Sequence, residues 1–211
     1  MLTPRMLTLA IDCATEACSV ALFDGEERIA ADYRILGRGH AEQLIPMIAE
    51  LPERGRADRI AVATGPGSFT GLRVGIAAAR ALAFAWGAEL VGYPTLALIA
   101  AMARAQLGQH AVTVAMTGGH GEWFVESFGS DGLQSRAFAA LTPGEAVVAA
   151  EERVAGNQAE ALVALRGTGQ ALPLWPDAGA MMLLPQAAWL TSDVRPIYGR
   201  APDARLPVIP I

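Results

Sequence analysis

The segment from Gly65 to Gly71 constrains the fold of this chain more than any other part of its sequence. Its residues, GPGSFTG, contain three glycines and a proline and lie between a short apolar run and a long helical pattern. Glycines allow a tight turn, and backbone N–H groups at the start of a helix can bind an anion. The sequence therefore predicts a strand, a turn and a helix in succession. A structural turn and a phosphate cradle explain the glycines equally well.

Two catalytic motifs that resemble this segment are excluded. A P-loop has a different spacing and needs a lysine, and this chain contains no lysine because all 16 of its basic residues are Arg. A nucleophile elbow places its serine midway between two glycines, but Ser68 directly follows Gly67. The absence of lysine also excludes Schiff-base catalysis, because that chemistry needs a primary amine.

Hydrophobic periodicity predicts the order of elements in the first half of the chain. Alternating apolar residues predict strands, and apolar residues three or four positions apart predict helices. The predicted strands are 7–12, 18–22, 28–36, 59–63 and 88–93, and the predicted helices are 41–51, 72–86 and 95–106. Pro46 predicts that the first helix is kinked or begins late. This order predicts a mixed α/β sheet that opens with an antiparallel meander and is flanked by helices.

The pattern partly restarts after Gly108. We expect strands over 110–116, 122–128 and 133–138, followed by helices over 143–151, 158–165 and 178–190. Two lobes, residues 1–106 and residues 107–211, fit this pattern better than one long sheet. Three prolines in 202–211 predict a loosely held terminus.

Composition and charge exclude several classes of protein. Hydrophobic residues make up 53% of the chain, which is typical of a folded globular protein and not of a disordered one. The formal net charge of -5 makes the chain a poor ligand for a nucleic-acid backbone by itself. The most apolar stretch, 76–91, includes Arg80 and Glu89 and is too short to span a membrane. No signal peptide is recognisable, so we expect a cytoplasmic protein without membrane association.

Cysteine and histidine residues give no sign of a metal site. Cys13 and Cys18 are the only cysteines, and we expect them to be two buried thiols because unpaired cysteine usually packs as a small hydrophobic residue. The three histidines lie far apart in the sequence and form no H-x-x-x-H pair. We therefore expect no metal-binding residues.

The helix predicted over 72–86 is apolar around most of its circumference. Its main apolar stripe consists of Leu72, Ile76, Ala79, Ala83 and Trp86. Its narrow polar face carries Arg73 and Arg80, with Ala77 and Phe84 between them. Such a helix is buried on more than one side. Either it lies at the centre of its lobe, or a partner protein covers what the lobe leaves exposed, and the periodicity does not decide between the two.

Three sequence blocks together resemble the bacterial TsaB (YeaZ) family. They are LAIDCATEACSVA at 9–21, His40 with EQLIPM at 42–47, and GPGSFTGLRV at 65–74, in the order and at the spacing that the family has. GPGSFTGLR is a highly specific signature. In the second half the likeness is looser and rests on GEWF at 121–124 and RPIYGR at 195–200.

The resemblance implies an actin-like (ASKHA), ribonuclease-H-like fold with two lobes. It also implies a role in forming N6-threonylcarbamoyladenosine at position 37 of tRNA. In that family TsaB is a non-catalytic paralogue of the transferase subunit TsaD and binds it through the first two helices of each N-terminal lobe. The ATPase TsaE joins the complex, and tRNA is contacted only through the complex. We expect a homodimer when TsaD is absent and no cofactor on the chain alone, and the resemblance leaves open whether ATP or ADP binds at the complex interface.

Carried over to this chain, the resemblance assigns two sets of residues. The partner interface would consist of Leu44, Ile45, Met47, Ile48, Leu51, Leu72, Arg73, Gly75, Ile76, Ala79, Arg80 and Ala83. The remnant of a nucleotide or phosphate loop would consist of Asp12, Thr15, Gly65, Gly67, Ser68, Thr70 and Gly71. On this assignment, Gly75→Arg is expected to block assembly.

Two alternatives stay open from the residues themselves. The chain could be a stand-alone nucleotide-binding protein that uses Asp12, Thr15 and the glycine turn, or a metallopeptidase-like enzyme of the glycoprotease type. The missing histidine pair argues against the second. One departure from the family pattern is MTGGH at 116–120, where the family has an aspartate and an arginine. This chain therefore has neither of those two charges at this position.

Overall fold

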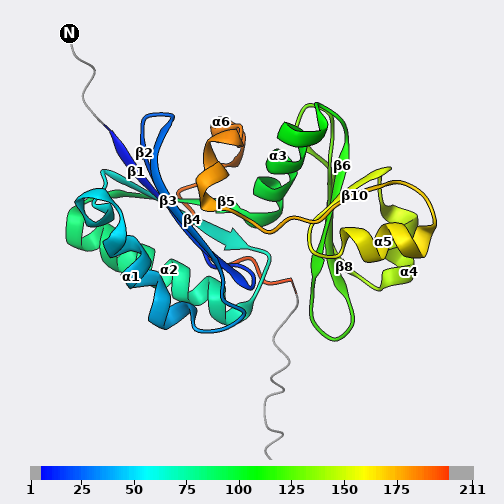
Figure 1. Ribbon diagram of the computed structural model, residues 1–211, viewed down its shortest axis with the longest axis horizontal. Helices are drawn as coiled ribbons and strands as arrows, with labels where there is room; N and C mark the ends of the chain where they lie inside the picture. The colour runs from blue at the N-terminus through cyan, green and yellow to red at the C-terminus, as the bar shows by residue number, and fades with distance from the viewer. Residues whose placement is uncertain (1–5, 200–211) are drawn as a thin grey trace, which may run out of the picture.

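The computed structural model describes residues 6–199 and contains two five-stranded sheets (Figure 1). The first sheet contains β1 (Leu7–Asp12), β2 (Ala17–Asp24), β3 (Glu27–Ile35), β4 (Arg59–Gly65) and β5 (Glu89–Pro94). The second contains β6 (Val112–Thr117), β7 (Trp123–Phe128), β8 (Gln134–Leu141), β9 (Arg153–Ala155) and β10 (Gln170–Leu172). The expected α/β architecture of two lobes with mixed sheets is confirmed.

Both sheets have the same topology. The strand order is β3-β2-β1-β4-β5 in the first and β8-β7-β6-β9-β10 in the second. In each, the first three strands along the chain pair antiparallel, and the last two add in parallel. The restart of the pattern after Gly108 therefore reflects a repeated fold, in which the second copy has shorter elements.

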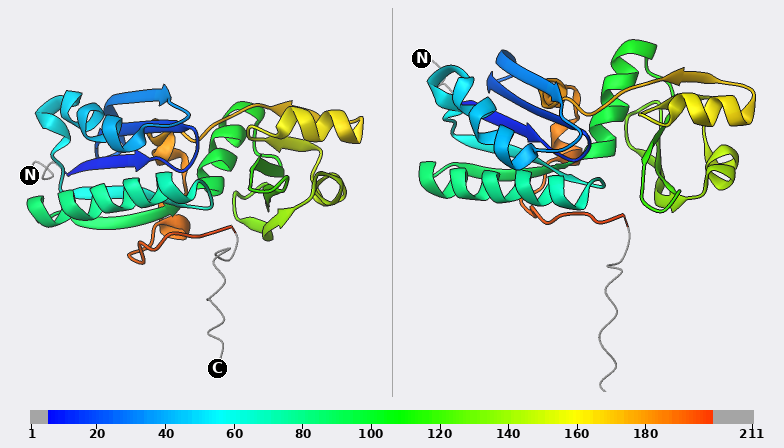
Figure 2. Two further views of the ribbon diagram at one scale, coloured as in Figure 1. Left: turned by 90° about the horizontal axis from the view of Figure 1, so that it is seen from below. Right: turned by 60° about the horizontal axis from the view of Figure 1, so that its bottom comes forward.

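Helices cover the faces of the sheets. They are α1 (His40–Glu50), α2 (Phe69–Trp86), α3 (Thr95–Leu107), α4 (Pro143–Ala149), α5 (Ala159–Arg166) and α6 (Gln186–Trp189), with 3-10 turns η1 (Pro52–Gly55) and η2 (Ala178–Leu183). α1 and α2 lie side by side on one face of the first sheet (Figure 2). α3 is buried on the opposite face and also packs against the second sheet, so it joins the two cores. The lobe boundary placed at residues 106 and 107 stays a prediction.

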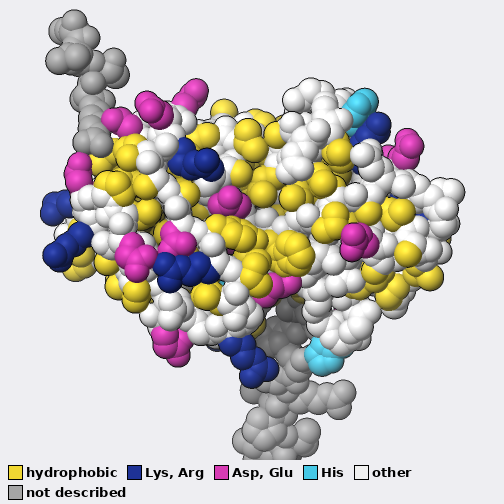
Figure 3. Space-filling model, in the orientation of Figure 1, with side chains coloured by type: hydrophobic (Ala, Val, Ile, Leu, Met, Phe, Trp, Pro, Cys, Tyr) yellow, Lys and Arg dark blue, Asp and Glu magenta, His cyan; other side chains and the backbone are white. Residues whose placement is uncertain are grey.

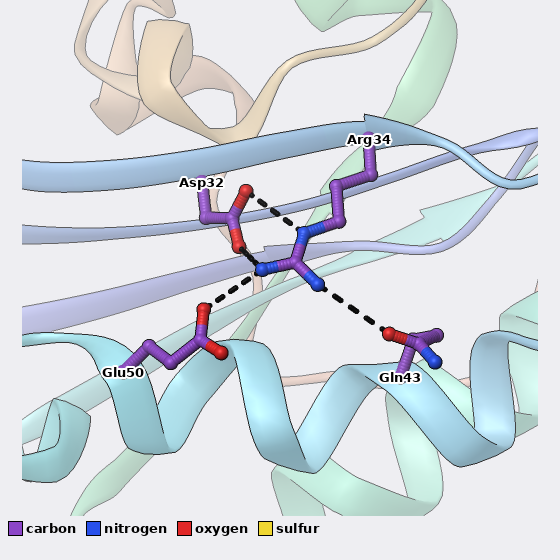
Figure 4. A network of polar contacts seen from close by, with 4 residues as sticks. All are labelled: Asp32, Arg34, Gln43 and Glu50. Carbon is purple, nitrogen blue, oxygen red and sulfur yellow. Dashed lines mark hydrogen bonds and ion pairs between the residues drawn. The ribbon is translucent and has the colours of Figure 1, made fainter.

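A polar network fixes α1 against the edge strand β3 (Figure 4). The Arg34 guanidinium lies 2.6 Å from Asp32 on its own strand and 2.8 Å from Glu50 near the end of α1. It also donates a hydrogen bond of 3.4 Å to the Gln43 amide oxygen. Because these side chains are partly exposed, each ion pair contributes little to stability, and the network mainly sets the position of α1.

α2 begins three residues earlier than the periodicity predicts. The Ser68 hydroxyl accepts a hydrogen bond of 3.3 Å from the Gly71 backbone N–H and so caps the helix, which lets Phe69 be its first residue. The helix ends where expected, at Gly87, whose φ of 67° lies in the left-handed region that favours glycine.

Several other predicted elements differ from the structure. α1 begins at His40 and includes Pro46, so the expectation of a late start was wrong. The single helix expected over 178–190 is two short pieces, because the backbone of Leu184 is extended after η2 and Pro185 then precedes α6. β9 and β10 were not predicted. The terminus expected to be loosely held, 202–211, lies outside the described residues.

Candidate functional site

A cleft of about 740 Å³ lies between the two lobes. One wall is formed by the β1–β2 turn and the glycine turn, through Thr15, Glu16, Gly67 and Ser68 among others. The second lobe contributes Met116, Thr117, Gly118, Gly119, His120, Phe124 and Asn157. The GPGSFTG segment and the MTGGH segment therefore face one another across the opening.

The glycines of the turn are needed because two backbone segments touch there. A Cβ atom on Gly67 would lie 2.1 Å from the Ala14 carbonyl oxygen, and one on Gly71 would lie 2.0 Å from the Cys13 carbonyl oxygen. The Ser68 N–H donates a hydrogen bond of 2.6 Å to the Ala14 carbonyl. The Gly71 N–H is bonded to the Ser68 hydroxyl. Both N–H groups are thus used within the chain, which favours the structural-turn interpretation over the phosphate cradle.

Asp12 is buried beneath this turn and does not line the cleft. Its Oδ1 accepts a hydrogen bond of 2.9 Å from the Ala14 N–H, and the Tyr93 hydroxyl lies 3.5 Å from its Oδ2. The same hydroxyl donates to the Ile11 carbonyl at 3.0 Å. Burial raises the pKa of Asp12 to about 7, since a charged carboxylate loses its hydration there. In this conformation Asp12 cannot reach a ligand in the cleft.

Glu16 supplies the acidic side chain of the cleft and connects the lobes. Its Oε1 accepts hydrogen bonds of 2.5 Å from Trp175 Nε1 and 3.0 Å from Asn157 Nδ2. Partial burial opposes ionisation, but the hydrogen bonds from Trp175 and Asn157 help to lower the pKa of Glu16. No arginine is found among the described residues that line the cleft. A phosphate there would face a carboxylate without a guanidinium to balance its charge.

The predicted loop residues divide into two groups. Thr15, Gly67 and Ser68 line the cleft, and the Thr15 hydroxyl also accepts a hydrogen bond of 3.1 Å from the Ala17 N–H. Asp12, Gly65, Thr70 and Gly71 lie outside the lining. Sequence reasoning missed Asn157 and Trp175, which belong to the other lobe and lie in no recognisable motif. Their role depends on contacts more than 140 positions apart in the chain.

Most of the residues predicted to form a partner interface are buried within the chain itself. These are Leu44, Met47, Ile48, Leu51, Leu72, Gly75, Ile76, Ala79 and Ala83. Their side chains cannot touch a partner while α1 and α2 keep these positions. Ile45, Arg73 and Arg80 are exposed. Arg80 donates to the Val194 carbonyl at 2.7 Å, and Arg73 stacks on Phe69 and donates to the Tyr198 hydroxyl at 3.0 Å.

Gly75 faces the sheet and not the surface. A Cβ atom there would lie 3.4 Å from Cys13 Cβ and 3.7 Å from the Val62 side chain. Gly75→Arg would therefore disrupt the chain's own core, and the expectation that it blocks assembly stays a prediction. The substitution is not a usable test of partner binding.

The exposed side of α2 carries an apolar stripe, Ala77, Ala81, Phe84 and Ala85, which we call the outer stripe. Phe84 is 92% exposed, the highest value among the large hydrophobic residues of the described chain. Ile45, on the neighbouring helix α1, is 49% exposed. Apolar side chains also gather over the edge strand β3 (Figure 3), where Ile29, Tyr33 and Ile35 are partly exposed.

Two absences can be stated for the described part of the chain. Within residues 6–199, no group of three or more His, Cys, Asp or Glu side chains is placed to hold a metal ion. No helix in the same range is long and apolar enough to cross a membrane.

Comparison with known proteins establishes the family. A family model described as "TsaD: tRNA N6-adenosine threonylcarbamoyltransferase" matches residues 34–165. A solved structure described as an uncharacterised protein with similarity to peptidase YEAZ from Pseudomonas aeruginosa is 30% identical, with a TM-score of 0.77 over 92% of this chain and 100% of that chain. The chain belongs to the TsaB (YeaZ) family. A second structure, YeaZ from Pseudomonas aeruginosa, is 28% identical with a TM-score of 0.75 over 92% of this chain and 99% of that one.

Curated relatives agree with the TsaB assignment. The tRNA threonylcarbamoyladenosine biosynthesis protein TsaB of Escherichia coli is 35% identical over 60% of this chain and 56% of its own length. The protein of the same name from Haemophilus influenzae is 40% identical over 50% of this chain and 45% of its own length. The chain thus spans about half the length of the curated TsaB relatives that it matches.

Proposed function

We propose that this chain is a non-catalytic subunit in the formation of N6-threonylcarbamoyladenosine in tRNA, and that it binds and activates a TsaD-like transferase. The names of its TsaB relatives support the pathway. The observation that carries the proposed role is the outer stripe of α2, which leaves Phe84 almost fully exposed. Phe84 continues an exposed row of alanines beside Arg80 on a long helix, and such an apolar row suits a surface that another protein covers.

The chemistry of the cleft supports a role without catalysis. The cleft has a carboxylate, Glu16, and no arginine among its described lining residues, and the carboxyl group of Asp12 is sealed beneath the turn. Two N–H groups that could hold a phosphate are bonded within the chain. A transferase that uses a nucleotide-activated substrate needs groups that stabilise phosphate charge, and we propose that a partner supplies them.

The outer stripe is suited to close helix packing. Ala77, Ala81 and Ala85 follow one another at four-residue intervals, and small side chains at this spacing let a second helix approach closely. Ile45 on α1, the helix that packs beside α2, is exposed as well. We propose that this surface, and not the buried stripe through Ile76 and Ala79, meets the TsaD-like partner. In the absence of that partner the same surface would form a homodimer.

Phe84→Asp is expected to weaken binding to a TsaD-like partner at least about tenfold, since it replaces an interface aromatic with a charge that must be desolvated. The measurement is a titration of the purified partner by calorimetry or surface plasmon resonance. Val148→Asp is a matched control, because Val148 is 86% exposed on α4 of the other lobe. Circular dichroism and thermal unfolding of both variants establish that they are folded. Unchanged affinity in Phe84→Asp would exclude the outer stripe as the interface.

The pathway itself is tested by reconstitution. The chain would be combined with a TsaD-like transferase, a TsaE-like ATPase, ATP, threonylcarbamoyl-adenylate and unmodified tRNA, and the nucleosides would be analysed by mass spectrometry. We expect threonylcarbamoyladenosine to form only when this chain is present. Equal formation without it would contradict the proposal, whatever the binding result.

Nucleotide binding by the chain alone is the second candidate function. The hydroxyl-bearing residues Thr15 and Ser68 line the cleft at the start of α2, where a helix N-terminus favours anions. Because Glu16 opposes a phosphate, we expect calorimetry with ATP and ADP to give no heat of binding for the chain by itself. Heat that appears only with the TsaD-like partner present would place ATP or ADP at the complex interface. Saturable binding to the isolated chain would favour the second candidate.

A further inference from the structure

Cys13 and Cys18 lie side by side at the base of the β1–β2 turn. Both are free and buried, and their sulfur atoms are 3.6 Å apart. β1 and β2 pair antiparallel with Asp12 opposite Ser19, so the next opposed pair in the same register is Cys13 and Cys18. The two thiols therefore come together through the register of a hairpin and not through a chance contact of distant loops.

Opposed positions of an antiparallel pair suit a disulfide. Their Cα atoms are typically about 4.5 to 5.5 Å apart, which lies within the range of about 4.4 to 6.8 Å seen across disulfides. The sulfur atoms need only approach from contact distance to a bond length of about 2 Å. Rotation of the two short side chains can supply this movement without a change of strand register.

We propose that Cys13 and Cys18 form a modification site, a dithiol that hydrogen peroxide converts to an intramolecular disulfide. This inference is independent of the proposed function. The Cys18 thiol loses its proton, the thiolate attacks one peroxide oxygen and the O–O bond breaks, and the released hydroxide combines with the proton that Cys18 lost to give water. The Cys13 sulfur then attacks the resulting sulfenic acid, and a second water leaves. In total, two thiols and one peroxide give one disulfide and two waters.

The hydrogen bond between the thiols assigns their roles. The hydrogen bond from Cys13 lowers the pKa of Cys18, which favours Cys18 as the thiolate that reacts first. Cys13 keeps its proton, because the same hydrogen bond and burial raise its pKa. Both sulfurs are shielded from solvent, so the site selects a small uncharged oxidant and excludes bulky disulfides such as oxidised glutathione.

The disulfide would act on α2. Cys13 packs against two glycines of this helix. A Cβ atom on Gly71 would lie 2.0 Å from the Cys13 carbonyl oxygen, and one on Gly75 would lie 3.4 Å from the Cys13 Cβ atom. Movement of Cys13 toward Cys18 therefore changes the packing at the start of α2. Oxidation is expected to alter the exchange of backbone amides in the first half of α2 more than in α3, whose buried residues belong to the other hydrophobic core.

The test is mass spectrometry of the full chain after treatment with hydrogen peroxide, denaturation and alkylation with iodoacetamide. We expect the reduced chain to gain two carbamidomethyl groups. The oxidised chain should gain none, lose the mass of two hydrogens and remain monomeric on a non-reducing gel. Dithiothreitol should restore both alkylation sites. Oxidised glutathione at the same concentration should leave the thiols reduced.

Other outcomes would overturn the proposal. Two alkylated cysteines after a peroxide treatment that oxidises a reference dithiol peptide would show that the pair does not react. Added oxygen without loss of both thiols, or a disulfide between two chains, would show that the sulfurs do not bond to each other. Cys13→Ala and Cys18→Ala are the variant controls, and neither should show the loss of two hydrogens. Unchanged amide exchange in α2 would overturn its coupling to the disulfide.

Discussion

Gly71→Ala is expected to lower the free energy of unfolding by roughly 3 kcal/mol or more, because the new methyl group would lie on top of a backbone carbonyl. The Cys13 carbonyl oxygen is 2.0 Å from the position of that methyl group, and backbone atoms cannot rotate away as a flexible side chain can. For a chain of this size the loss corresponds to a fall in Tm of roughly 6 to 12 °C. Urea unfolding followed by circular dichroism measures it.

Gly144→Ala is the matched control for this prediction. Gly144 lies in the first turn of α4, and a Cβ atom there would meet nothing within 4 Å. This substitution should be neutral or stabilise the protein by up to about 1 kcal/mol, since it reduces the freedom of the unfolded chain. Gly67→Ala should resemble Gly71→Ala, because its methyl group would meet the Ala14 carbonyl. If Gly71→Ala and Gly144→Ala were equally stable, the tight contact between the two turns would be disproved.

The first lobe could be predicted from the sequence because its elements are long enough to show their periodicity. The eight residues of β2 and the eighteen of α2 each contain several repeats of their apolar pattern. β9 and β10 have three residues each, which is too short for an alternation to be recognised. They are strands because they pair in parallel with β6 and with each other, and that pairing is a tertiary property.

The glycine turn was predicted, but the physical reason for its glycines was not. The sequence places Gly67 and Gly71 before a helix, where a phosphate cradle and a tight turn look alike. Only the position of the β1–β2 turn reveals that the carbonyls of Cys13 and Ala14 occupy the space that side chains would need. The partners of Glu16 could not be predicted either, because Asn157 and Trp175 reach it from the second lobe.

The surface of α2 illustrates a limit of helical periodicity. When a helix is apolar on most sides, the spacing of residues does not say which side meets the sheet. From the sequence, the main apolar stripe, which includes Ile76 and Ala79, is assigned to a partner. Phe84 is placed on the polar face with Arg73 and Arg80. Burial resolves the two sides, since Ile76 and Ala79 are in the core while Phe84 is in solvent. The predicted partner helices are unchanged, but of the side chains assigned to the interface only Ile45, Arg73 and Arg80 are exposed, and Phe84 was not among them.

Asp12→Asn is expected to stabilise the protein at alkaline pH, and the gain should vanish in acid. Burial raises the pKa of Asp12 from 3.8 to about 7, so the folded state holds a proton that the unfolded state has already released. Stability contributed by this group is present below about pH 4 and is lost as the pH rises to about 7. A shift of about three pKa units corresponds to about 4 kcal/mol, which sets the upper size of the gain.

Urea unfolding of the wild type and of Asp12→Asn at about pH 4 and about pH 8 isolates the contribution of the Asp12 carboxyl group, because all other groups titrate in both proteins. Asparagine keeps the oxygen that accepts the Ala14 N–H, so the turn can retain its shape. Parallel pH curves for the wild type and Asp12→Asn would mean that Asp12 is ionised in the folded state at little cost. The carboxylate would then be hydrated or paired, and the buried, sealed position of Asp12 beneath the cleft would have to be abandoned.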